Sequence, residues 1–247
     1  HLGLETTALG FRAGFTGQAL EEMLLDIGCH TDLIPIEGFT RINVKIKSAQ
    51  ETDINSQGPA IPSQAQEALF QKLDALSGDD FLVLAGSIPH TMPDNAYEQI
   101  MKRLDGKNIR IVVDATGDLL TNVLPYRPFL IKPNHLELGD IFGKTLHTLR
   151  EVIEHAKLLQ KRGAKNVLVS LGKTGAVLIA EGGEVLQSQP PEGKPVNLWG
   201  RETVWLQDFY TVTLQAVIIG RPFAWDYAPE APALFSPGLP RKNKLKR

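Results

Sequence analysis

In Val167-Leu168-Val169-Ser170-Leu171-Gly172-Lys173-Thr174-Gly175-Ala176, a continuous apolar run leads into a turn that holds two glycines. The run from Val167 to Leu171 is typical of a strand covered on both faces, as in a parallel sheet. Glycine lets a backbone approach a nucleotide closely and expose its amides to the phosphates. The turn is therefore a candidate nucleotide loop, although many β-hairpins share its pattern.

Apolar runs of the same kind occur elsewhere in the chain and alternate with segments of helical periodicity. Phe81 to Leu84 and Ile109 to Val113 are two of these runs. The alternation predicts βαβ units and an α/β fold with a mostly parallel central sheet. Three capping-box patterns predict helix starts: Ser63 with Gln66, Asn134 with Glu137, and Thr148 with Glu151.

Residues 32–57 interrupt this alternation, because they read as strands with no helix between them. We expect a small β insertion that stands off the main sheet as a lid. In a strand of period two, Arg41, Asn43 and Lys45 point to one face. Two cations and an amide on one face could clamp a phosphate. The alternative is an ordinary exposed strand face.

Two motifs place polar groups after predicted strands. Ala85-Gly86-Ser87-Ile88-Pro89 could present backbone amides to a substrate, and Lys132-Pro133-Asn134-His135-Leu136-Glu137 combines polar side chains with a helix start. Open α/β sheets bind ligands at the carboxyl ends of their strands. The Glu137 carboxylate could hold the water shell of a phosphate-bound magnesium ion. The alternative for this second motif is only a well-capped helix. Asp114 and Asp118 also follow a strand, and we expect solvated or capping roles for both.

Composition excludes several classes of protein. The net charge of −2 gives no bulk attraction to nucleic acid or to an anionic membrane, and we interpret the basic C-terminal cluster as a solvated end. No apolar run approaches the roughly 20 residues of a membrane span. Cys29 is the single cysteine, which excludes a disulfide framework and favours a reducing, cytoplasmic location.

The order of these motifs resembles the PfkB branch of the ribokinase-like sugar kinases, and within it the bacterial 1-phosphofructokinases. The resemblance covers residues 1–197 and implies a ribokinase-like three-layer α/β/α domain with a β lid. It implies sugar-phosphate binding by Arg41, Asn43, Lys45, Gly86 and Ser87. It assigns the ATP site to Lys132, Asn134, Ser170, Gly172 and Gly175, and Mg²⁺ to Asn134 and Glu137.

The reaction implied is transfer of the ATP γ-phosphoryl group to the 6-hydroxyl of fructose 1-phosphate, which gives fructose 1,6-bisphosphate. Tagatose-6-phosphate kinase is the alternative within the class, because it shares nearly all of these motifs. The partners implied are the sugar phosphate and ATP, together with a second copy of the chain bound through the lid. Neither nucleic acid nor membrane is implied.

The sequence departs from the family pattern at both ends. It begins after the family's Gly-Gly-Lys-Gly segment, and it lacks the family's Gly-Ala-Gly-Asp motif, whose aspartate is the catalytic base. A codon choice for Leu198 to Phe209 gives Val-Gly-Ala-Gly-Asp-Ser-Met-Val-Ala-Gly-Phe when two bases are dropped. The same shift gives a family-like end from Phe235 to Arg247. We therefore predict an incomplete kinase domain over residues 1–197 and an out-of-frame, irregular tail over residues 198–247.

The alternative is a genuinely divergent C-terminus. Without the family base, we expect this chain to be a non-catalytic remnant that at best binds nucleotide.

Overall fold

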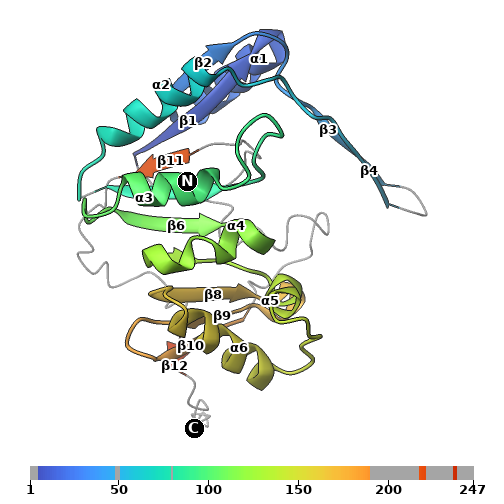
Figure 1. Cartoon of the computed structure of the whole chain (residues 1–247). Helices are drawn as coiled ribbons and strands as arrows, with labels where there is room; N and C mark the ends of the chain where they lie inside the picture. Colours follow the sequence, from blue (N-terminus) through green and yellow to red (C-terminus); the bar gives the residue numbers. More distant parts are fainter. Residues whose placement is uncertain (1–4, 48–50, 79, 190–216, 221–235, 238–247) are drawn as a thin grey trace, which may run out of the picture.

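The centre of the protein is a mixed sheet, seen in the computed structural model, which describes residues 5–47, 51–78, 80–189, 217–220 and 236–237 (Figure 1). In these residues the strand order is β12-β10-β9-β8-β7-β6-β5-β11-β1-β2. The strands β2, β1, β5, β6, β7 and β8 all run in one direction. The bounds are β1 (Thr6–Ala13), β2 (His30–Ile36), β5 (Phe81–Ala85), β6 (Arg110–Asp114), β7 (Leu130–Ile131), β8 (Asn166–Ser170), β9 (Ala176–Ile179), β10 (Val185–Ser188), β11 (Val217–Gly220) and β12 (Ser236–Pro237).

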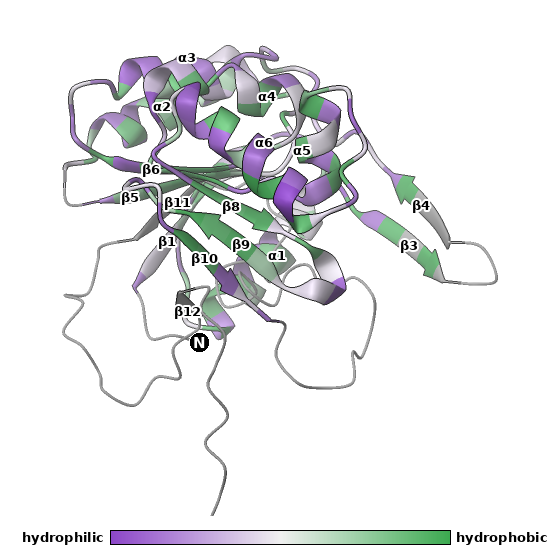
Figure 2. Cartoon of the chain, turned by 90° about the horizontal axis from the view of Figure 1, so that it is seen from below, coloured by the Kyte–Doolittle hydropathy of each residue, from purple (hydrophilic) through white to green (hydrophobic). Residues whose placement is uncertain are grey.

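Helices α2 to α6 lie together on one side of this sheet (Figure 2). Their apolar residues and those of the strands form the main core. No helix in the described ranges has the length and apolar character that membrane spanning requires. The helices are α1 (Gly14–Asp26), α2 (Ser63–Asp74), α3 (Ala96–Arg103), α4 (Gly117–Thr121), α5 (His135–Ile141) and α6 (Leu149–Lys161), with short 3₁₀ turns at Leu124–Tyr126 and Gly172–Thr174.

Helix α1 covers the other face of the sheet beside β1 and β2. Successive strand residues point to opposite faces, so Leu9 joins the main core while its neighbour Ala8 packs with Leu24 of α1. The arrangement confirms the predicted α/β fold. Gly14 is the first residue of this helix.

Two of the three predicted capping boxes are present. Asn134 and Thr148 each cap their helix, with Glu137 and Glu151 reaching back to the cap residue. The prediction at Ser63 was wrong, because α2 begins at Ser63 and its N-cap position is occupied by Pro62. Gln66 instead donates to the Ile61 carbonyl at 3.0 Å.

The predicted lid is a two-stranded antiparallel sheet of β3 (Asn43–Lys47) and β4 (Glu51–Asn55), which projects away from the main sheet (Figure 1). The region from residue 32 to residue 36 belongs to β2, which pairs with β1 in the main sheet. Arg41 precedes β3, so the period-two argument holds from Asn43 onward. The side chain of Lys45 lies outside the described part of the structure.

The described segments of the predicted irregular tail are strands. Residues 217–220 form β11, which lies antiparallel between β1 and β5. Residues 236–237 pair with β10. The sequence Val217-Ile218-Ile219 is β-branched throughout and so has high β propensity. The tail therefore contains strands at these two places, and its other residues lie outside the described ranges. The out-of-frame origin of residues 198–247 stays a prediction.

The packing of α6 predicts a contrast between two adjacent leucines. Leu159 is fully buried against the sheet, whereas Leu158 is 40% exposed. We expect Leu159→Ala to lower the free energy of unfolding by about 2–5 kcal/mol, because it opens a cavity in the core. Leu158→Ala should change it by less than about 1 kcal/mol. Urea denaturation checks both values, and equal losses would contradict this packing.

Candidate functional site

Four neighbouring parallel strands end at one edge of the sheet. β5, β6, β7 and β8 are paired in that order, so their carboxyl ends lie side by side. Polar residues follow or close each of them. These are Gly86 and Ser87 after β5, Asp114 at the end of β6, Lys132 and Asn134 after β7, and Ser170 at the end of β8. The sheet therefore gathers residues that are far apart in the sequence.

The lid meets this edge through Arg41. Its Nη2 donates to the Ser87 Oγ at 3.1 Å, across 46 positions of sequence. Gly86 turns the chain with φ of 84°, a left-handed conformation that favours glycine. Arg41, Gly86 and Ser87 are thus brought together. Asn43 lies on the exposed β3, and the Lys45 side chain is outside the described part of the structure.

Asp114 and Lys132 form an ion pair between the two halves of the site. Lys132 Nζ lies 3.2 Å from Asp114 Oδ1, and the two side chains are only 16% and 30% exposed. Burial raises the pKa of the Asp114 carboxyl, and the Lys132 ammonium partly offsets that rise. The expectation of a solvated or capping Asp114 was therefore wrong. One signal in the sequence could have found this pair. Asp114 ends one predicted strand and Lys132 follows the next strand along the chain, so neighbouring parallel strands would bring them together.

The nucleotide half of the predicted site is continuous in space. Asn134 and Ser170 form a parallel bridge, and Ser170 N–H donates to the Pro133 carbonyl at 3.2 Å. In the loop that follows, Gly172 and Gly175 have φ of 58° and 99°. The loop closes through a hydrogen bond of 2.8 Å from Leu171 N–H to the Gly175 carbonyl. Positive φ at both glycines explains why this turn requires them.

The residues predicted to handle magnesium are already engaged with α5. Asn134 Oδ1 accepts the Leu136 and Glu137 N–H groups at 2.9 Å each, and Glu137 Oε2 accepts the Asn134 N–H at 2.8 Å. Both lone-pair directions of the Asn134 amide oxygen are therefore used by the cap. The described residues contain no group of three His, Cys, Asp or Glu side chains that could hold a metal. Asn134 and Glu137 therefore fit a hydrated magnesium ion that is held mainly by phosphates. They do not fit a site in which protein side chains alone coordinate the metal.

The sequence matches the family described as "pfkB family carbohydrate kinase" over residues 1–200, and the chain belongs to that family of phosphotransferases with an alcohol acceptor. It is 39% identical over 193 residues to the 1-phosphofructokinase of Bacillus subtilis, which covers 78% of this chain and 63% of that enzyme. It is 35% identical to the D-tagatose-1-phosphate kinase of Bacillus licheniformis, over 99% of this chain and 80% of that enzyme.

A solved structure agrees with the fold. Phosphofructokinase-2 from Escherichia coli, in complex with fructose-6-phosphate, superposes with a TM-score of 0.74 at 26% identity, covering 83% of this chain and 69% of that one. The fold is therefore ribokinase-like, as the sequence predicted. This chain spans 63% of the length of the Bacillus subtilis enzyme that it matches.

The ion pair predicts a pH-dependent cost of removing Lys132. In Lys132→Met the Asp114 charge stays half-buried without its partner, so we expect a loss of about 1–3 kcal/mol in unfolding free energy at neutral pH. The raised pKa of Asp114 means that its charge opposes folding above that pKa. The loss of unfolding free energy in Lys132→Met should therefore shrink as the pH falls through the pKa of Asp114.

Urea denaturation at several pH values measures this deficit. Lys165→Met is the matched control, because Lys165 lies 4.0 Å from Glu181 in an exposed pair. Its effect should be near zero at every pH. A Lys132→Met deficit that grows on acidification would contradict the assignment.

Proposed function

We propose that the intact form of this kinase transfers the γ-phosphoryl group of ATP to the 6-hydroxyl of fructose 1-phosphate, and that the present chain retains the ligand sites. The observation that carries the proposal is the contact of Arg41 with Ser87. It brings a lid cation to the strand edge that also holds the glycine loop. The similarity to a 1-phosphofructokinase supports the choice of sugar.

The sugar phosphate lies at the lid end in this proposal. Arg41 offers a bidentate fork that suits phosphate geometry, and Lys45 would add a point charge. Asn43 would contribute its amide. Gly86 and Ser87 would supply backbone amides and a hydroxyl at the end of β5. Closure of the lid over this end would exclude water from the reacting groups.

ATP lies at the other end of the same edge. The turn that contains Gly172 and Gly175 lets its backbone approach the nucleotide, while Ser170 and Asn134 adjoin it. Lys132 would neutralise phosphate charge. Magnesium, when carried by the phosphates, would lie near the N-terminus of α5. There Glu137 would accept hydrogen bonds from its water shell and so orient it.

A second candidate function is ligand binding without efficient turnover. The sequence contains no Gly-Ala-Gly-Asp, the motif that carries the base in the family it resembles. Phosphoryl transfer depends mainly on positioning and charge neutralisation, and a positioned base contributes about 10²–10⁴ in rate. We infer that this chain binds its ligands and turns over slower by about that factor. Soluble protein with full kinase turnover would contradict this.

Tagatose phosphates are the alternative substrates. Tagatose-6-phosphate kinases share nearly all of the motifs described above, and a relative of this chain is a D-tagatose-1-phosphate kinase. The two names differ in the position of the phosphate. A panel of fructose 1-phosphate, tagatose 1-phosphate and tagatose 6-phosphate separates these possibilities by affinity.

We also propose that the lid forms a homodimer contact. Ile42, Val44, Ile46 and Ile54 are between 45% and 61% exposed, although they are apolar. Val44 and Ile54 are direct cross-strand partners, so their side chains share one face of the lid. A second copy of the lid would cover this face. For location we propose the cytoplasm, since Cys29 is the single cysteine.

The role of Arg41 predicts a selective loss of sugar-phosphate binding. Arg41→Ala should raise the Kd for fructose 1-phosphate about 10- to 100-fold, because a charge-assisted hydrogen bond to phosphate is lost. The Kd for ATP should change less than about twofold. Isothermal titration measures both. Arg150→Ala is the control, since Arg150 is 88% exposed and pairs with Glu154 within α6.

The lid contact predicts a change in association. Val44→Ser should weaken dimerisation by about tenfold or more, because it removes apolar area from the contact. Sedimentation velocity over a concentration series measures this. Leu25→Ser changes an exposed leucine on α1 and should leave association unaltered. A monomer at all concentrations for the unchanged chain would overturn the dimer proposal.

A further inference from the structure

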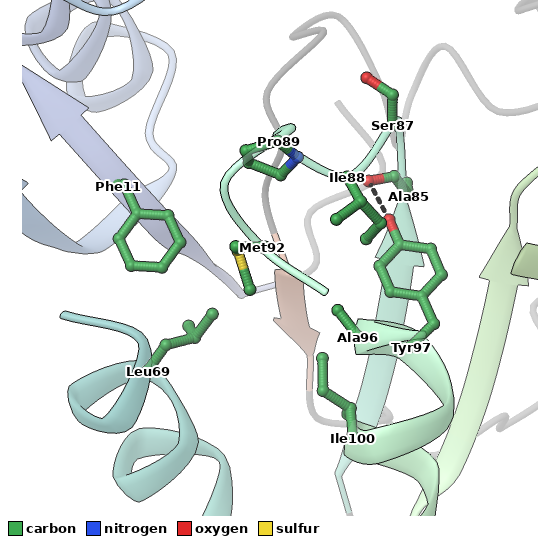
Figure 3. A pocket seen from close by; sticks show the side chains of 10 residues that line it. All are labelled: Phe11, Leu69, Ala85, Ser87, Ile88, Pro89, Met92, Ala96, Tyr97 and Ile100. Carbon is green, nitrogen blue, oxygen red and sulfur yellow. Dashed lines mark hydrogen bonds between the residues drawn. The ribbon is translucent and has the colours of Figure 1, made fainter. Parts of the chain in front are cut away.

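Tyr97 lies in the first turn of α3 and points back to the end of β5 (Figure 3). The residue is 6% exposed. Its hydroxyl lies 2.7 Å from the Ala85 carbonyl oxygen and 3.1 Å from that of Gly86. A phenol has one hydrogen to donate, so the two carbonyls share it, with Ala85 the nearer acceptor. One side chain thus holds two successive peptide groups of the turn that precedes Ser87.

These contacts fix the direction of the backbone amides. The peptide group is planar, and the described chain has no cis bond. In a trans peptide the C=O and N–H vectors are antiparallel. The Gly86 and Ser87 N–H groups therefore point away from Tyr97. With φ of 84° at Gly86, this turn would otherwise have alternative orientations open to it.

The turn also borders a pocket. A cavity of about 40 Å³ lies under it, between Tyr97 and Ile100 on one side and Phe11 and Leu69 on the other (Figure 3). Figure 3 shows the Ser87 side chain directed away from the cavity.

The tyrosine keeps its proton under ordinary conditions. Burial raises the pKa of the Tyr97 hydroxyl, and the nearby Asp114 carboxylate raises it further. The hydroxyl is therefore a donor throughout the neutral pH range. Its two acceptors are backbone carbonyls, which have no titration of their own. The restraint on the turn is consequently independent of pH in that range.

We propose that Tyr97 is a positioning residue for the sugar-phosphate subsite, holding the Ala85 and Gly86 carbonyls and so fixing the turn that places Ser87 against Arg41. This inference rests on the proposed function, because it assigns Tyr97 to the same site. Tyr97 is not itself a catalytic residue, since it acts through the backbone. Its effect should appear in sugar-phosphate binding and be absent from nucleotide binding.

The test compares Tyr97→Phe with the full chain. The change keeps the ring and removes only the hydroxyl. We expect the Kd for fructose 1-phosphate to rise about 3- to 10-fold, the range for one lost neutral hydrogen bond, with the Kd for ATP within about twofold. Amide hydrogen exchange of residues 85–88 should quicken at least about threefold, while that of β8 stays unchanged. The exchange measurement needs no ligand.

Tyr126→Phe is the matched control. The Tyr126 hydroxyl donates to Glu98 at 3.2 Å, outside the site, so this change should alter neither affinity nor exchange at residues 85–88. Equal weakening of both ligands in Tyr97→Phe would show a general loss of structure and overturn the inference. Unchanged sugar-phosphate affinity and unchanged amide exchange in Tyr97→Phe would overturn this inference and leave the proposed function standing. Failure of the unchanged chain to bind any sugar phosphate would overturn the proposed function as well.

Discussion

Parallel hydrogen bonding among β5, β6, β7 and β8 is the constraint on which the rest of the structure depends. Neighbouring parallel strands must be joined by crossover connections. In this protein the crossovers contain the helices that cover one face of the sheet. The parallel pairing also brings four carboxyl ends to one edge. The glycine turns, the Asp114–Lys132 pair and the α5 cap all occur at that edge. The core and the candidate site therefore have one origin.

The edge is divided electrostatically. Arg41 serves the lid end, while Lys132 lies toward the glycine loop and is balanced by Asp114. A cation held by a half-buried carboxylate is positioned before any ligand arrives, which reduces the reorganisation that binding requires. The two cations are supplied by different elements, one of which stands away from the sheet. Under the proposed function, the nucleotide end would be built into the sheet, and the sugar end would depend on how the lid lies.

Sequence reasoning predicted the features that depend on local pattern. Continuous apolar runs identified β5, β6 and β8, and the caps of α5 and α6 followed from the Asn134 and Thr148 patterns. What it missed depends on neighbours far along the chain. The partner of Asp114 is 18 positions away and becomes visible only when β6 and β7 pair. The strand at residues 217–220 was missed because its place is set by β1 and β5, and not by its own flanks.

The position of β11 has a consequence for the order in which the molecule assembles. Among the described strands, β1 and β2 are joined to the others through β11, which is more than 200 residues from β1 in sequence. Their hydrogen-bond ladder is therefore complete only when residues this far apart in the chain have come together. Contacts so distant in sequence close slowly, because a long loop must be ordered before they form. Until β11 is in place, the facing edges of β1 and β5 remain unpaired, and unpaired strand edges are prone to association with other chains.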